Sequence, residues 1–320
     1  MPKIPVLLIT GFLGSGKTSF LSEYLSAKGD KSTALIINEL GQIALDQRVL
    51  KSSVSYADEQ MLYLNSGCVC CNKRLDLVNS LKSLLDSYDK QNQKLGRVII
   101  ETTGIANPAP ILWTLLSDVF LSAHFATQGV IACVDAMNGF LHLENNEARQ
   151  QIIFADSVLL TKTDLQNDTQ ALKAEILALN PSLAVFDKAK VRYDELFSQA
   201  NKANFRAFEM GNSHEQGFET LALGFDGAVE WSAFGIWLSL LLQKHGTRIL
   251  RVKGILDIGE DFLVSINGAM HIIHPPTHIK KDQENGSKLV FITRNLPKEQ
   301  ILRSLDGFKG LLKAEFKILS

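Results

Sequence analysis

The feature that most constrains the fold of this 320-residue chain is a glycine-rich loop close to its N-terminus. Residues 11–18 read Gly-Phe-Leu-Gly-Ser-Gly-Lys-Thr and match the phosphate-binding pattern G-x-x-x-x-G-K-[ST] at every fixed position. The loop follows the apolar run Ile4–Thr10 and precedes a helix expected over Lys17–Ala27, which is the strand–loop–helix context that the pattern requires. This context predicts a P-loop NTPase domain.

The first part of the chain alternates short β-rich runs with amphipathic stretches, which is typical of βαβ units. We expect strands over Ile4–Thr10, Thr33–Asn38, Arg97–Glu101, Gly129–Val134, Ser157–Thr161 and Leu183–Phe186. We expect helices over Lys17–Ala27, Arg74–Tyr88, Pro108–Asp118, Glu147–Ala155 and Thr169–Leu179. The alternation predicts an α/β fold with a mainly parallel sheet and helices on both faces.

The pattern changes after about residue 205, in a junction that runs from Asp187 to Gly217. Ser232 is the expected N-cap of a helix that ends near Gly246. We expect strands over Ile249–Leu256, Phe262–Asn267, Met270–Ile273 and Leu289–Thr293. Asn267-Gly268 is the expected hairpin turn between two of them, and a last helix is expected over Lys298–Leu305. We therefore expect a P-loop domain over residues 1–205 and a smaller α+β domain with an antiparallel sheet over 206–320.

Composition excludes several classes of function. Lys and Arg total 33 against 34 Asp and Glu, a net charge of -1, so the chain lacks the basic excess that broad binding to a nucleic-acid backbone requires. No apolar run approaches the roughly 18 residues of a membrane span, and the N-terminal apolar stretch has no signal-peptide cleavage pattern. We expect a cytoplasmic protein that binds neither nucleic acid nor membrane.

The loop residues have distinct expected roles in binding a nucleotide. Lys17 would bridge the β- and γ-phosphates, and the Thr18 hydroxyl would bind magnesium. The glycines allow backbone N–H groups to turn towards the phosphates, and the helix N-terminus adds a favourable dipole. The expected nucleotide-binding residues of this segment are Gly11, Gly14, Ser15, Gly16, Lys17, Thr18 and Ser19.

Two later segments have the pattern of a nucleotide switch. The apolar strand 97–101 ends in Glu101, which can hold magnesium or its water, and Gly104 follows where it can approach the γ-phosphate. Glu39 ends the preceding strand and offers a second carboxylate on the same edge. We assign Lys17, Glu39 and Glu101 to the catalytic machinery.

The base is expected to be read by the segment Thr161-Lys162-Thr163-Asp164, which ends another apolar strand. A carboxylate at Asp164 can accept hydrogen bonds from guanine N1–H and the 2-amino group, and adenine offers neither donor. The nucleotide is therefore expected to be GTP or GDP, held by Thr161, Lys162 and Asp164.

Three of the four cysteines, Cys68, Cys70 and Cys71, fall within four residues, whereas Cys133 lies in an apolar run and is expected to be buried. Adjacent cysteines make a poor disulfide framework, and in a reducing compartment such a group more often binds metal. Three thiolates suit zinc, or Co²⁺ or Ni²⁺, and leave a fourth coordination position open. A buried cluster of small side chains and a redox relay are the alternative interpretations.

Five motifs in this order resemble those of the CobW family of metal-trafficking GTPases, relatives of the GTPases that help to load nickel into hydrogenase and urease. They are the phosphate loop, Asn-Glu-x-Gly at 38–41, Gly-Cys-x-Cys-Cys at 67–71, Glu-x-x-Gly at 101–104 and Lys-x-Asp at 162–164. Glu-Trp-Ser at 230–232, entering a helix, is similar to the family's C-terminal domain. The resemblance implies that the three clustered thiols bind the transported metal, and that the residues assigned above bind GTP and Mg²⁺.

The chain departs from the family pattern at three positions. Thr161 stands where Asn usually begins Asn-Lys-x-Asp, Leu40 replaces a phenylalanine, and Gln42 stands where an acid is frequent. The first departure weakens the case for strong guanine selectivity. His271, His274 and His278 could form a second metal site. Packing or surface roles are the favoured interpretation, because residues three apart on a strand point to opposite faces.

The leading hypothesis is a GTP-hydrolysing metallochaperone that uses GTP, Mg²⁺ and Zn²⁺ and passes the metal to a client metalloprotein, acting alone or as a homodimer. The first alternative is a GTP-responsive zinc buffer or sensor that loads no client. The second is a small-molecule phosphotransferase, although no general base for an acceptor stands out. No glutamine or arginine stands out for transition-state stabilisation either, so we expect slow intrinsic turnover or help from a partner.

Overall fold

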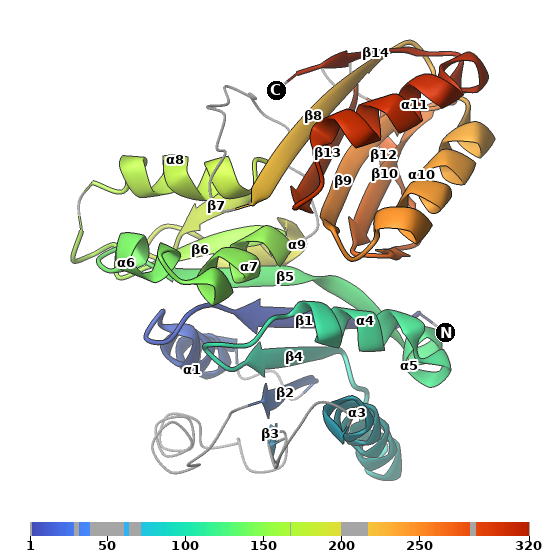
Figure 1. Cartoon of the computed structure of the whole chain (residues 1–320). Helices are drawn as coiled ribbons and strands as arrows, with labels where there is room; N and C mark the ends of the chain where they lie inside the picture. Colours follow the sequence, from blue (N-terminus) through green and yellow to red (C-terminus); the bar gives the residue numbers. More distant parts are fainter. Residues whose placement is uncertain are drawn as a thin grey trace. The chain divides into compact units, whose positions relative to one another are not determined.

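The computed structural model of the chain describes residues 2–28, 32–38, 61–63, 72–166, 168–199, 217–281 and 286–319 (Figure 1). The chain divides into two compact units, Met1–Lys173 with Ala184–Lys202 and Ala174–Leu183 with Ala203–Ser320. The predicted boundary between residues 205 and 206 lies outside the described residues and stays a prediction.

The first unit is built on a parallel sheet of seven strands in the order β3-β2-β4-β1-β5-β6-β7. The strands are β1 (Ile4–Thr10), β2 (Thr33–Asn38), β3 (Met61–Tyr63), β4 (Arg97–Thr102), β5 (Phe125–Asp135), β6 (Ser157–Thr161) and β7 (Ala184–Asp187). Residues 6–10 of β1 and 98–102 of β4 are all buried, as expected for central strands covered on both faces. Since the strands run parallel, the carboxyl ends of β1, β4, β5 and β6 lie at one edge of the sheet.

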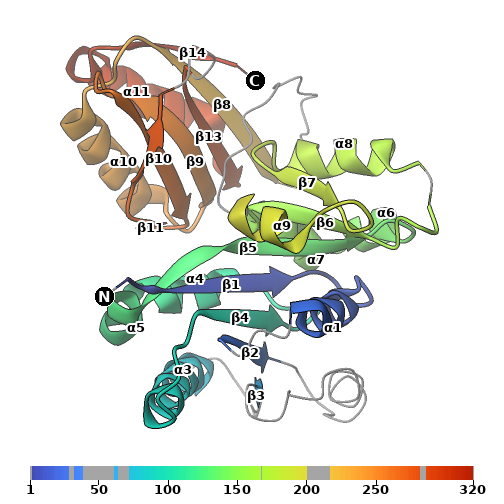
Figure 2. The ribbon, with the colours of Figure 1, turned by 180° about the vertical axis from the view of Figure 1, so that it is seen from behind.

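Helices cover both faces of this sheet (Figures 1 and 2). The described helices before residue 200 are α1 (Lys17–Lys28), α3 (Asn72–Lys90), α4 (Ala109–Ser117), α5 (Val119–His124), α6 (Gly139–Leu143), α7 (Asn146–Phe154), α8 (Gln170–Leu179) and α9 (Tyr193–Gln199). On one face, Phe20 and Tyr24 of α1 pack with Phe197 of α9 over the central strands. On the other face, α4 and α7 contact β5.

The second unit has an antiparallel sheet in the order β11-β10-β9-β13-β8-β14, with β12 paired to β10. Its elements are β8 (Phe218–Asp226), α10 (Trp231–His245), β9 (Ile249–Asp257), β10 (Phe262–Ala269), β11 (Ile272–Ile273), β12 (Thr277–Lys280), β13 (Ser287–Arg294), α11 (Lys298–Leu312) and β14 (Glu315–Ile318). The α10 and α11 helices share a core with the sheet, in which Trp237 packs on Phe291 and donates a hydrogen bond to Ser304 Oγ at 3.0 Å. No described helix is long and apolar enough to cross a membrane.

The predicted fold class is confirmed, a P-loop α/β unit with a mainly parallel sheet and a smaller α+β unit. The β1, β2 and β6 strands have the predicted bounds, whereas β5 begins at Phe125 rather than at Gly129 because its first residues also pair with β1. Seven of the described elements were not predicted, namely β3, α5, α6, α9, β8, β12 and β14, and α11 runs two turns beyond its predicted end.

Two local predictions in the second unit are wrong. Asn267 and Gly268 do not form a hairpin turn, because both pair with β9 inside strand β10, and the chain reverses at Met270, whose φ is +54°. The helix that follows residue 230 is capped by Glu230 and not by Ser232, because α10 begins at Trp231. The Glu230 carboxylate accepts hydrogen bonds from the backbone N–H groups of Ser232 and Ala233, at 3.2 and 2.6 Å.

Candidate functional site

The phosphate loop occupies the turn between β1 and α1, and its three glycines, Gly11, Gly14 and Gly16, all have positive φ angles. Gly11 and Gly16 have φ angles of +143° and +83°, which L-residues rarely adopt. A Cβ atom on Gly11 would lie 2.4 Å from the carbonyl oxygen of Cys133, and one on Gly16 would lie 3.3 Å from Thr161 Oγ1. The backbone of the loop therefore packs directly against the ends of β5 and β6.

Lys17 and Thr18 open the α1 helix, with Ser19 following in the same turn. The Lys17 ammonium donates hydrogen bonds to the carbonyl oxygens of Gly11 at 2.8 Å and Phe12 at 3.1 Å, so it is held over the loop. Thr18 Oγ1 donates to Glu101 Oε1 at 3.1 Å, and Glu101 is buried at the end of β4. The fold thus brings together a hydroxyl and a carboxylate, the hard oxygen ligands that Mg²⁺ prefers.

The segment that ends β6 lies directly under the loop. Thr161 Oγ1 donates to the Ser15 carbonyl oxygen at 2.8 Å, and Lys162 Nζ donates to that of Gly14 at 3.0 Å. Lys162 has a φ of +56° and also forms an ion pair with Asp135 at 2.6 Å. Asp164 lies two residues further on and is exposed.

Asp135 is a site residue that the sequence reasoning missed. It is the last residue of β5, as Glu101 is the last but one of β4, and this similar position is the signal that could have identified it. Burial alone would raise its pKa, but hydrogen bonds from Lys162, Asn138 and the backbone of Met137 hold the pKa below its usual 3.8. Asp135 is therefore a buried carboxylate that anchors Lys162 beside the loop.

The turn after β4 is held from two sides. Gly104 lies so close to the loop that a Cβ atom on it would be 2.8 Å from the backbone nitrogen of Leu13. On the other side, Gln151 of α7 is buried and its Nε2 donates to the carbonyl oxygens of Gly104 and Ala106, both at 3.1 Å. Gln151 was also missed, because nothing in its local sequence distinguishes it from any helical glutamine.

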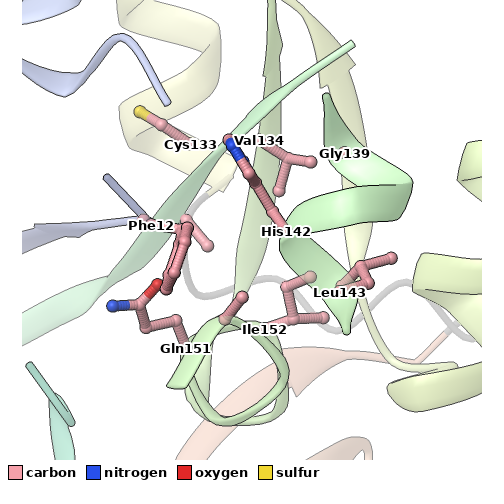
Figure 3. Close-up of a pocket in the computed structure, with 11 residues that line it drawn as sticks. Phe12, Cys133, Val134, Gly139, His142, Leu143, Gln151 and Ile152 are labelled. Carbon is pink, nitrogen blue, oxygen red and sulfur yellow. The ribbon is translucent and has the colours of Figure 1, made fainter. Parts of the chain in front are cut away.

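A small pocket lies behind the first residues of the loop, beside β5, α6 and α7 (Figure 3). The ring of Phe12 faces that of His142, with centroids 5.1 Å apart, and the Gln151 side chain lies nearby. Burial lowers the pKa of His142 from its usual 6.5, so the ring is neutral at pH 7. With a volume of about 10 Å³ the pocket has room for no more than one water molecule.

Several predicted site residues lie outside the described residues. They are Glu39, Cys68, Cys70 and Cys71, together with the departures Leu40 and Gln42. Within the described part of the chain, no three His, Cys, Asp or Glu side chains gather where they could hold a metal ion. Cys133 is buried as predicted, and burial raises the pKa of its thiol to about 12, so it remains protonated.

The parallel sheet, the loop between β1 and α1, and the Thr18–Glu101 pair at the carboxyl edge define a P-loop nucleotide-binding protein. The sequence matches the family described as the CobW/HypB/UreG nucleotide-binding domain over residues 5–187, and the cobalamin synthesis protein CobW C-terminal domain over residues 218–309. The chain therefore belongs to the CobW family of P-loop GTPases.

Relatives and solved structures agree with this membership. The chain is 30% identical to the zinc chaperone YjiA of Escherichia coli over 97% of its own length and 100% of that protein. It is 26% identical to the zinc chaperone CobW of a Sinorhizobium species over 80% of its own length and 82% of that protein. The crystal structure of a Zn(II)-bound triple mutant of YjiA GTPase matches with a TM-score of 0.73 and 26% identity, covering 96% of this chain and 99% of the other.

Replacing Asp135 with Asn should lower the free energy of unfolding at pH 7 by about 1–2 kcal/mol, because the buried acceptor would lose its charged hydrogen bond to Lys162. Since the folded-state pKa of Asp135 is lowered, its carboxylate stabilises the fold above pH 3.8, and this contribution is lost as the pH falls through the lowered pKa. The difference between parent and variant should therefore be smaller at pH 3 than at pH 7 in urea titrations.

A matched control for this variant is Asp118→Asn. Asp118 caps α5 by accepting from the backbone N–H of Leu121, and Asn caps helices about as well as Asp. If Asp118→Asn and Asp135→Asn had the same effect at both pH values, the ion pair with Lys162 would contribute nothing specific.

Proposed function

We propose that this chain is a GTP-dependent zinc chaperone that binds GTP and Mg²⁺ at the carboxyl edge of its parallel sheet. It carries zinc on Cys68, Cys70 and Cys71 and passes the metal to a client metalloprotein. The observation that carries the nucleotide half is the contact between Thr18 and Glu101, which joins the phosphate loop to β4. Whole-length similarity to the zinc chaperone YjiA supports the metal half.

Each residue of the proposed nucleotide site would have its own chemical role. Lys17 would neutralise charge on the β- and γ-phosphates, and Thr18 with Glu101 would hold Mg²⁺ or its water ligands. Gly104 allows the turn after β4 to lie against Leu13, where the backbone N–H of Gly104 could approach the γ-phosphate. Asp164 would read the guanine edge, while Glu39 would complete the second switch segment.

The proposed metal site is supported by the sequence of the C-x-C-C motif and by the helix that follows this motif. Three thiolates around a divalent ion leave a net charge of -1 and an open position through which metal could be handed over. In the sequence, Cys71 directly precedes the 19-residue helix α3, and a helix N-terminus favours thiolate over thiol. This placement favours zinc binding by the motif.

Within the described residues, packed contacts run from the turn after β4 to α3, the helix that follows the three thiols in the sequence. The turn at 103–108 leads into α4, and Arg74 in the first turns of α3 stacks on Trp113 of α4 with its guanidinium carbon 4.2 Å from the ring centroid. Arg74 also donates a hydrogen bond to Ser117 Oγ at 3.3 Å. A shift of the turn on GTP binding could therefore move the helix that follows the three thiols.

If the two halves are coupled, the nucleotide should change zinc affinity by about 5- to 150-fold, the usual range for linked sites. Zinc affinity would be measured by chelator competition with GDP and with a non-hydrolysable GTP analogue. A parent protein whose zinc affinity is the same in both states would not be a GTP-driven chaperone, and a zinc buffer would then be the better description.

A further inference from the structure

The side-chain amide of Gln151 binds the backbone of the turn that follows β4. Its Nε2 atom donates hydrogen bonds to the carbonyl oxygens of Gly104 and Ala106, both at 3.1 Å. A side-chain NH₂ group carries two protons, so each carbonyl can receive one of them. Only 1% of the surface of Gln151 is exposed, so both bonds are shielded from water.

The turn itself has little apolar anchorage. The backbone N–H of Ala106 donates to the carbonyl oxygen of Thr103 at 3.1 Å, which closes a four-residue turn with Gly104 and Ile105 at its centre. Gly104 has no side chain, and 49% of the surface of Ile105 is exposed. The position of this turn against the phosphate loop therefore depends strongly on the two hydrogen bonds from Gln151.

Gln151 is well placed to hold the turn, because it belongs to the α7 helix, which packs on the central sheet. Ile152 and Phe154 of this helix are buried, and α7 contacts β5. The Gln151 side chain lies beside Phe12 and His142 in the small pocket behind the phosphate loop (Figure 3). The amide is thus carried by a rigid part of the fold.

The orientation of the amide follows from its surroundings. The Oε1 atom of Gln151 is buried and has no hydrogen-bond partner in the described part of the chain. Turning the amide over would bring this oxygen against the carbonyl oxygens of Gly104 and Ala106, which are acceptors as well. The amide therefore has one stable orientation, in which both of its protons bind the turn.

We infer that Gln151 is a positioning residue that holds the turn at 103–106 ready for the γ-phosphate and so sets the preference for GTP over GDP. The inference rests on the proposed nucleotide site and deepens it. A turn that is already anchored needs little ordering when it contacts a γ-phosphate. GDP has no γ-phosphate and does not make this contact, so its affinity should not depend on Gln151.

The test compares the parent with Gln151→Met, which has a side chain of similar length and no donor. Without its anchor the turn must be ordered when the γ-phosphate binds, so the affinity for a non-hydrolysable GTP analogue should fall by about ten-fold. The affinity for GDP should stay within about two-fold of the parent. Calorimetry with both nucleotides and Mg²⁺ measures the two affinities.

The matched control is Gln150→Met, the same substitution one position earlier in α7. Gln150 accepts a hydrogen bond from the exposed side chain of Asn107 at 3.0 Å and should keep both affinities within about two-fold. Gln151→Asn replaces the methionine variant if that variant does not fold, as judged by its thermal unfolding. Its side chain is shorter by one methylene, so its amide cannot reach both carbonyl oxygens.

Amide hydrogen exchange tests the anchor without any nucleotide. The backbone N–H of Ala106 closes the turn, so it should exchange about ten-fold faster in Gln151→Met than in the parent or in Gln150→Met. An unchanged exchange rate would mean that Gln151 does not hold the turn.

Two results of the nucleotide measurements would also overturn the inference. A ratio of GTP-analogue to GDP affinity that is unchanged or higher in the Gln151 variants would mean that the anchor does not prepare the turn for the γ-phosphate. An equal loss of both affinities would indicate a general structural role. A parent protein that binds neither nucleotide would instead count against the proposed function, and the exchange rates would still decide whether Gln151 holds the turn.

Discussion

Replacing Lys17 with Ala is expected to lower GTP hydrolysis by about 10²–10³-fold or more, the usual loss when one group aimed at transition-state charge is removed. The Lys17 ammonium lies 2.8 and 3.1 Å from the carbonyl oxygens of Gly11 and Phe12, which holds it at the phosphate site. Phosphate release by the purified variant, under single-turnover conditions with Mg²⁺, measures the effect.

The fold should survive this substitution, because Lys17 belongs to no apolar cluster of the sheet. Lys90→Ala, an exposed lysine at the end of α3, is the matched control and should hydrolyse GTP at the parent rate. If Lys17→Ala hydrolysed GTP as fast as Lys90→Ala, the phosphate loop would not be the catalytic site.

Replacing Cys68, Cys70 or Cys71 with Ser should each weaken zinc by about 100-fold, if the roughly 10–16 kcal/mol of a four-ligand zinc site is shared among its ligands. The triple variant should lose measurable affinity. Zinc binding releases thiol protons, so affinity in the parent should rise with pH until the thiols are ionised. Chelator competition at several pH values measures both effects.

Cys133→Ser is the matched control, since this buried thiol stays protonated and is expected not to ligate zinc. The triple variant keeps the phosphate loop and should bind GTP, but zinc should no longer alter its GTP turnover. Zinc affinity that survives the triple substitution would show that the C-x-C-C motif is not the metal site.

Much of the fold of the first unit could be predicted because local and tertiary preferences agree there. β1, β2 and β6 are continuous apolar runs that end at polar or glycine residues, so their bounds follow from the sequence alone. In the second unit, local and tertiary preferences disagree at Asn267-Gly268. The local sequence favours a hairpin turn, but both residues extend β10 because this keeps their hydrogen-bonded pairing with β9.

The candidate site divides in a similar way. The loop glycines, Lys17, Thr18 and Glu101 follow a spacing that a sequence motif can encode, and the structure brings the last two together. Asp135 and Gln151 act on partners that the fold, and not a local motif, brings to them: Asp135 on Lys162 and Gln151 on the turn at 104–106. The hydrogen bond from Thr161 to the carbonyl oxygen of Ser15 likewise depends on the backbone of a segment that is distant in the sequence.

The buried state of Cys133 makes the folded chain simple to probe with thiol chemistry. The chain has four cysteines, and Cys133 is enclosed by the core that α1 and α9 form over the sheet, so a reagent cannot reach it without unfolding. Any alkylation of the native protein must then occur at Cys68, Cys70 or Cys71. The number of labels per chain, read by intact-mass spectrometry, therefore reports directly on that trio and on how much of it a bound metal protects.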